Sequence, residues 1–144
     1  MKRSPPVFVD TSYFVALLNK LDGEHARARE LAAIWHRLAT KLCTTDAVLV
    51  ETHNWFSRSP LRSSAARALQ ALRGAEGWTI VHASTDLIRR GERRYTTHAD
   101  KTWSLTDCIS MEAASDARVK QVATTDKHFE QAGFEILMGG GART

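Results

Sequence analysis

The sequence lacks the features that mark a secreted, membrane-spanning or zinc-stabilised protein. It contains only two cysteines, Cys43 and Cys108, with no Cys-x-x-Cys pair, which argues against a disulfide framework and a zinc site. No stretch of even ten residues is free of polar groups, so we expect no membrane span. The apolar run that begins at Val7 ends at Asp10, before the hydrophobic region of a signal peptide could form. We therefore expect a soluble, cytoplasmic protein.

The length and charge narrow the possibilities further. A chain of 144 residues can close one hydrophobic core but is short for two. We expect one domain over residues 1–138, followed by a flexible, glycine-containing tail over residues 139–144. The 20 Lys and Arg residues exceed the 16 Asp and Glu residues, and this modest excess favours a polyanionic partner.

Short β-prone runs alternate with amphipathic helical patterns along the chain. The expected strands are 7–9, 42–44, 78–82, 121–124 and 134–137, and the expected helices are about 11–18, 26–39, 46–56, 62–73, 85–95, 105–114 and 127–132. Strands joined through helices pair in parallel with right-handed crossovers, so we predict an α/β fold with a central parallel sheet and helices on both faces. In such folds the functional site lies beyond the carboxyl ends of the strands.

Four acidic residues fall where this fold could bring side chains together. Asp10 directly follows the first expected strand, and Asp126 follows the fourth. Asp107 lies in the first turn of a helix, and Glu51 lies inside the helix after the second strand. Converging carboxylates repel one another unless a cation neutralises them, and oxygen ligands favour Mg²⁺ or Mn²⁺ over Zn²⁺. Such an ion supports displacement at phosphorus, which indicates a phosphodiester substrate.

Each acid also has a purely structural interpretation. Asp10 could cap the following helix, Asp107 could be stabilised by the helix dipole, and Asp126 could be a turn residue. Glu51 differs, because it interrupts an apolar series on a helix whose core-facing side would tolerate an acid poorly. Single-residue arguments therefore favour a functional role only for Glu51.

Taken together, the four positions resemble those of the PIN-domain nucleases, in particular the VapC-like toxins of bacterial toxin–antitoxin pairs. The resemblance spans nearly the whole chain and is carried, in the expected order, by residues 7–12, 51, 100–110 and 124–129. It implies a metal-dependent endoribonuclease in which Mg²⁺ or Mn²⁺ is bound by four carboxylates, those of Asp10, Glu51, Asp107 and Asp126. Asp10 and Asp107 would be the main ligands. The resemblance further implies an RNA substrate, a homodimer and an antitoxin protein that blocks the site.

Two other functions stay open at this point. A phosphatase with an aspartyl nucleophile would also place Asp10 after a strand, but Ser12 stands where a second Asp would be needed. A catalytically silent domain of the same fold could bind RNA or a protein, although the complete set of four acids argues against it.

Several basic and aromatic residues have no assigned role. Two pairs of arginines lie four positions apart on one expected helix, Arg89 with Arg93 and Arg90 with Arg94. They could face RNA phosphates, but a solvated face balanced by neighbouring acids is favoured. Three tryptophans in apolar patterns are expected in the core or at a dimer contact: Trp35, Trp55 and Trp78. Trp103 is left open, and no histidine is given a catalytic role.

Overall fold

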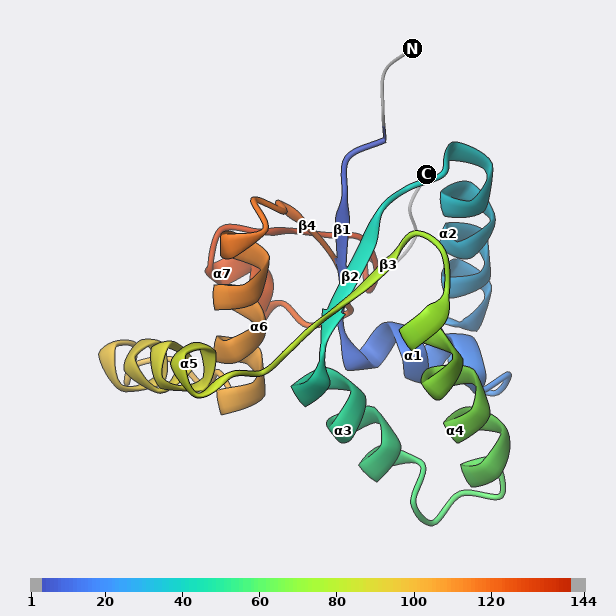
Figure 1. Cartoon of the computed structure of the whole chain (residues 1–144), viewed down its shortest axis with the longest axis horizontal. Coiled ribbons are helices and arrows are strands. Elements are labelled where there is room, and N and C mark those ends of the chain that lie inside the picture. The colour runs from blue at the N-terminus through green and yellow to red at the C-terminus, as the bar shows by residue number, and fades with distance from the viewer. Residues whose placement is uncertain (1–3, 141–144) are drawn as a thin grey trace.

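The computed structural model of the chain describes residues 4–140, which form five strands, seven α-helices and one short 3₁₀ helix (Figure 1). The strands are β1 (Val7–Val9), β2 (Leu42–Thr45), β3 (Trp78–Val81), β4 (Gln121–Ala123) and β5 (Glu135–Ile136). The helices are α1 (Thr11–Leu18), α2 (His25–Leu38), α3 (Asp46–Trp55), α4 (Arg62–Ala71), η1 (Leu72–Gly74), α5 (Thr85–Thr97), α6 (Leu105–Asp116) and α7 (His128–Gln131).

The five strands form one sheet in the order β3-β2-β1-β4-β5, and every pairing is parallel. In the central strand β1, Phe8 lies beside Cys43 of β2 and Val122 of β4. All three residues of β1 are buried, as expected for a strand that is covered on both faces and flanked on both edges. The edge strand β3 is only partly buried.

Helices cover both faces of the sheet. Figure 1 shows α1, α2 and α4 on one side and α5, α6 and α7 on the other. Each connection between neighbouring parallel strands runs through at least one helix. The predicted α/β class with a central parallel sheet and helices on both faces is therefore confirmed. Within the described residues, no helix is both long and apolar enough to cross a membrane.

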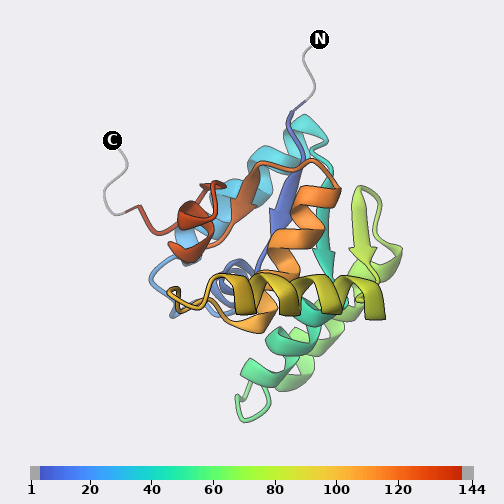
Figure 2. The ribbon, with the colours of Figure 1, turned by 90° about the vertical axis from the view of Figure 1, so that its left-hand side faces the viewer.

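The contact between α5 and α6 depends on a glycine and on ion pairs. Helix α5 lies across α6 (Figure 2), and a Cβ atom at Gly91 would come within 2.6 Å of Ile109 Cγ1. Only glycine allows the two helices to approach this closely. Arg90 and Arg94, on the same helix as Gly91, form ion pairs with Asp116 and Glu112 of α6 at 2.7 Å and 2.6 Å.

The ion pairs show which of the four arginines on α5 are held by acids and which are exposed. Arg90 and Arg94 are held by acids of α6 and by Asp86, so they connect two helices. Arg89 and Arg93 are exposed and make no ion pair among residues 4–140. The expected solvated face is therefore found only for Arg89 and Arg93, whereas Arg90 and Arg94 are partly buried and are balanced mainly by acids of α6.

The C-terminal segment is connected to the start of α2. The Gly139 N–H donates a 2.7 Å hydrogen bond to Glu24 Oε1, and Arg27 Nε donates to the carbonyl oxygen of Leu137. Residues 141–144 of the expected tail lie outside the described residues. The proposed boundary between residues 138 and 139 stays a prediction.

Candidate active site

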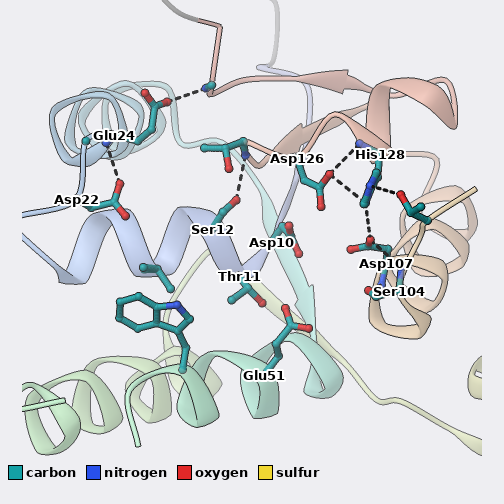
Figure 3. A pocket seen from close by; sticks show the side chains of 16 residues that line it. Asp10, Thr11, Ser12, Asp22, Glu24, Glu51, Ser104, Asp107, Asp126 and His128 are labelled. Atoms are coloured by element: carbon teal, nitrogen blue, oxygen red, sulfur yellow. Dashed lines mark hydrogen bonds and ion pairs between the residues drawn. The ribbon is translucent and has the colours of Figure 1, made fainter. Parts of the chain in front are cut away.

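A cleft of about 960 Å³ opens at the edge of the sheet where β1 and β4 end. All four predicted acids line it, and in Figure 3 they surround a common space. They reach the cleft from four separate parts of the chain: Asp10 before α1, Glu51 on α3, Asp107 on α6 and Asp126 before α7. The structure thus brings together the whole set that the sequence predicted.

Asp10 is placed by its position between β1 and α1. The residue is 6% exposed, and its Oδ2 accepts a 2.8 Å hydrogen bond from the Thr124 hydroxyl. Although Asp10 occupies the N-cap position of α1, its side chain makes no capping hydrogen bond. The capping interpretation of Asp10 is therefore wrong, and its carboxylate is free to face the cleft.

Burial raises the pKa of Asp10 to about 7, and the negative charges of Asp107 and Glu51 act in the same direction. The hydrogen bond from Thr124 partly offsets this rise. A carboxyl group with such a pKa is largely uncharged below neutral pH unless a cation lies beside it. The electrostatics of the cleft therefore favour a bound positive charge.

Asp107 has a structural role in addition to its place in the cleft. Its Oδ2 accepts the Ser104 N–H at 3.1 Å, and the Ser104 hydroxyl accepts the Asp107 N–H at 3.0 Å. This capping box begins α6 and fixes the direction of the carboxylate. The helix-start interpretation of Asp107 is confirmed, and the same buried carboxylate also lines the cleft.

Asp126 lies in the turn after β4 and meets a histidine that the sequence did not single out. Its Oδ1 accepts the His128 N–H at 2.9 Å and lies 3.1 Å from His128 Nδ1. The same Nδ1 lies 3.0 Å from Asp107 Oδ2. One potential ligand atom from each of Asp107, Asp126 and His128 lies within 4.8 Å of the others.

His128 was missed because its neighbour in space is distant in sequence. Asp107 and His128 are 21 positions apart, and no pattern in the sequence indicates that α6 and the turn after β4 converge. The only available signal was the Asp126-x-His128 spacing, in which a turn can present both side chains to one side.

Glu51 extends from α3 toward the cleft and is half-buried (Figure 3). It makes no hydrogen bond or ion pair within residues 4–140. One helical turn later, Trp55 lines the same cleft and is 52% exposed, so it is not a core residue. Trp35 is buried as predicted. Trp103 is buried too, and its indole N–H donates to Gln131.

The lining of the cleft fits a hydrated divalent cation. It contains six carboxylates and one histidine but no Lys or Arg from the described residues: Asp10, Asp22, Glu24, Glu51, Asp107, Asp126 and His128. Thr11 also lines the cleft, and its buried hydroxyl has no hydrogen-bond partner among residues 4–140. A buried hydroxyl without a partner costs about 1–3 kcal/mol, so an ion or its water shell would supply what this group lacks.

A family model described as the PIN domain matches residues 7–135, from the start of β1 into β5. The chain belongs to the PIN-domain family. The nucleases of this family use divalent metal ions, which agrees with the acidic cluster in the cleft.

Curated and solved relatives are similar over most of the chain. The 23S rRNA-specific endonuclease VapC20 of Mycobacterium tuberculosis is 28% identical over 128 residues, which cover 89% of this chain and 95% of that protein. Its crystal structure, described as that of a sarcin-ricin loop cleaving toxin, matches with a TM-score of 0.79 at 27% identity, over 89% of this chain and 95% of that one.

More distant structures share the fold alone. VapBC2 from Rickettsia felis, bound to a DNA fragment from its promoter, matches with a TM-score of 0.62 at 15% identity, over 90% of this chain and 96% of that one. FitAcB from Neisseria gonorrhoeae matches with a TM-score of 0.64 at 14% identity, over 94% of this chain and 99% of that one.

Proposed function

We propose that this chain is a divalent-metal-dependent endoribonuclease that uses Mg²⁺ or Mn²⁺ and acts as the toxin of a toxin–antitoxin pair. The observation that carries the proposal is the convergence of four carboxylates on one cleft in a PIN-domain chain. The similarity to VapC20, which is named as an endonuclease acting on ribosomal RNA, supports RNA as the substrate.

The burial and the hydrogen bonds of the four acids suggest different roles in binding the metal ion. Asp10 and Asp107 are buried and held by hydrogen bonds from Thr124 and Ser104, so they are the best-placed ligands. Asp126 and Glu51 are more exposed and would bind the ion or orient the attacking water. When bound, the ion supplies Lewis-acid stabilisation of the charge that develops on the scissile phosphate.

The charge of the cleft makes RNA binding there depend on the ion. Six carboxylates and no basic side chain from the described residues line the cleft, so a phosphate group entering alone would be repelled. The exposed indole of Trp55 offers the cleft a surface on which a nucleobase can stack. We therefore expect metal-dependent binding of the scissile phosphate, supported by stacking beside Glu51.

The proposed partners are a structured RNA and an antitoxin. Because VapC20 is described as cleaving the sarcin-ricin loop, an RNA hairpin with that loop is the first substrate to test. An antitoxin that covers the cleft would block access to the acids. The homodimer implied by the family resemblance stays a prediction.

A cleavage assay tests the proposed function. The purified chain is incubated with the hairpin RNA and Mg²⁺ or Mn²⁺, and parallel samples contain excess EDTA, single-stranded DNA or a phosphomonoester. We expect cleavage at an internal RNA position that EDTA abolishes. Turnover of the phosphomonoester would instead support the phosphatase, and turnover of no substrate would support the silent domain.

The toxin role needs a cellular test. Induced expression of the chain in bacteria should arrest growth. If an antitoxin is encoded by the reading frame beside the gene for this chain, co-expression of that reading frame should restore growth. The Asp107→Asn variant should have no effect on growth. Growth arrest by this variant equal to that by the unchanged chain would contradict a toxin that acts through RNA cleavage.

A further inference from the structure

The imidazole of His128 lies directly against two of the proposed metal ligands. Its Nδ1 is 3.0 Å from Asp107 Oδ2 and 3.1 Å from Asp126 Oδ1 (Figure 3). Its Nε2 is 3.1 Å from the hydroxyl of Thr102. The ring is therefore held from both sides, with Nδ1 directed at the carboxylates. His128 also lines the cleft that contains the other acids.

Because Nε2 is paired with the Thr102 hydroxyl, Nδ1 of His128 can be either the protonated or the unprotonated nitrogen of the ring. A hydroxyl can either donate or accept a hydrogen bond, so Thr102 can pair with either neutral tautomer of His128. With the proton on Nδ1, the ring donates to the carboxylates. With the proton on Nε2, the ring donates to Thr102, and the Nδ1 lone pair is directed toward the space between Asp107 and Asp126. The change moves one proton within the ring and releases none.

We infer that His128 is a nitrogen ligand of the divalent ion and shifts the preference of the site from Mg²⁺ toward Mn²⁺. The inference rests on the proposed function, because it names a further ligand for the same ion. A second observation points to an ion in this cleft: Thr11 lines the cleft, and the buried hydroxyl of this residue has no hydrogen-bond partner among residues 4–140.

Ligand chemistry explains the expected change in preference. Mg²⁺ retains most of its water and binds proteins through one or two carboxylates, whereas transition metals accept imidazole nitrogen readily. A site of carboxylates alone distinguishes weakly between Mg²⁺ and Mn²⁺. Adding the Nδ1 atom of His128 strengthens binding of Mn²⁺ more than binding of Mg²⁺.

The same contacts have a competing explanation. The ring could fill the place of the ion and hold Asp107 and Asp126 together by donating to both carboxylates. In that case metal binding would have to displace the ring, and removal of His128 would tighten binding. The two explanations thus predict opposite changes in metal affinity.

Metal binding is measured directly with the untagged full chain and its variants His128→Gln, His128→Ala and His36→Gln. His36 is an exposed residue of α2 that does not line the cleft, so its variant is the matched control. Titration calorimetry gives the Kd for Mn²⁺ and for Mg²⁺, and pulsed electron paramagnetic resonance of bound Mn²⁺ reports a directly coordinated nitrogen. Circular dichroism checks that each variant folds.

We expect a nitrogen signal from bound Mn²⁺ in the unchanged chain and in His36→Gln that is absent in both His128 variants. The Kd for Mn²⁺ should rise about 10-fold or more in the His128 variants, and that for Mg²⁺ should rise less. A missing nitrogen signal in the unchanged chain, or tighter Mn²⁺ binding by the variants, would overturn the inference.

Failure of this inference is distinguishable from failure of the proposed function. RNA cleavage by a protein whose Mn²⁺ shows no nitrogen signal would refute the ligand role and leave the nuclease intact. A nitrogen signal without cleavage of any RNA would refute the nuclease and leave the metal site intact.

Discussion

The hydroxyl of Thr124 donates a 2.8 Å hydrogen bond to Asp10 Oδ2, joining residues that are 114 positions apart. The bond exists because β4 lies beside β1 in the sheet, so the two residues that follow these strands are neighbours. The same Thr124 oxygen accepts the Asp126 N–H at 3.0 Å and lies 3.1 Å from the Ser12 hydroxyl. One buried side chain therefore positions two of the four acids.

Replacing Thr124 should weaken both the fold and the site. Thr124→Val keeps the shape of the side chain but removes the hydroxyl that donates to the buried Asp10 carboxyl, at a cost of about 1–3 kcal/mol in unfolding free energy. RNA cleavage should fall as well, because Asp10 and Asp126 lose a common anchor. Urea denaturation and cleavage kinetics measure the two effects. Thr124→Ser retains the hydroxyl and should therefore retain most of the stability and most of the cleavage rate. Equal losses in Thr124→Val and Thr124→Ser would contradict this role of the hydroxyl.

Removing a proposed main ligand should abolish catalysis without unfolding the chain. Asp10→Asn and Asp107→Asn should each lower the rate of metal-dependent RNA cleavage by about 100-fold or more, because an amide binds a divalent ion poorly. Asp46→Asn is the matched control, since Asp46 is an acid at the start of α3 that pairs with Arg73 outside the cleft. Cleavage by a folded Asp10→Asn or Asp107→Asn variant at the normal rate would refute the assigned ligands.

The raised pKa of Asp10 predicts a specific dependence of stability on pH. Its ordinary value is 3.8 and its value in the metal-free fold is about 7, so between these pH values the folded chain holds a proton that the unfolded chain has released. Stability of the metal-free chain should therefore fall as pH rises through this range.

Asp10→Asn mimics the protonated side chain and should remove this dependence. At pH 8 the metal-free variant should be more stable than the unchanged chain, by up to about 4 kcal/mol, and the difference should vanish toward pH 4. Urea unfolding of both proteins in EDTA at several pH values provides the measurement. If the unfolding free energies of the two proteins changed in parallel with pH, burial would not raise the pKa of Asp10.

The exposed indole beside Glu51 should contribute to RNA binding more than to chemistry. Trp55→Ala should raise KM for RNA about 10-fold, because loss of one stacked base costs about 1–3 kcal/mol, and should change kcat less. Trp55→Phe should recover part of the loss. Val50→Ala is the control, since Val50 is also exposed on α3 but does not line the cleft. An unchanged KM in Trp55→Ala would exclude stacking.

Replacing an ion-paired arginine of α5 should lower the thermal stability of the chain, and replacing an exposed, unpaired arginine of α5 should not. Arg90→Ala removes ion pairs with Asp86, Glu112 and Asp116 and should lower Tm by a few degrees. Arg89→Ala should leave Tm unchanged, because this exposed side chain forms no ion pair among the described residues. Thermal unfolding followed by circular dichroism compares the variants, and equal shifts in Tm would contradict the assigned ion pairs.

Local patterns in the sequence were sufficient to predict the elements and their class. The apolar run before Asp10 and the Ser104 start of α6 are visible in short windows, because strand periodicity and helix capping depend on neighbouring residues. Parallel pairing also followed, since strands separated by helices have few other arrangements. The boundaries of the first helix and of β1 match the prediction closely.

For the candidate site too, some features could be predicted from the sequence and others required the structure. The sequence by itself determined that Asp10 and Asp126 follow strands, that Asp107 lies at a helix start and that Glu51 lies inside a helix. The family resemblance placed these four acids in one set. Only the tertiary structure decided that Asp10 does not cap its helix, that Trp55 lies in the cleft and that His128 contacts Asp107. These facts depend on which strands are neighbours and how helices pack, and contacts between distant segments leave no pattern in a single sequence.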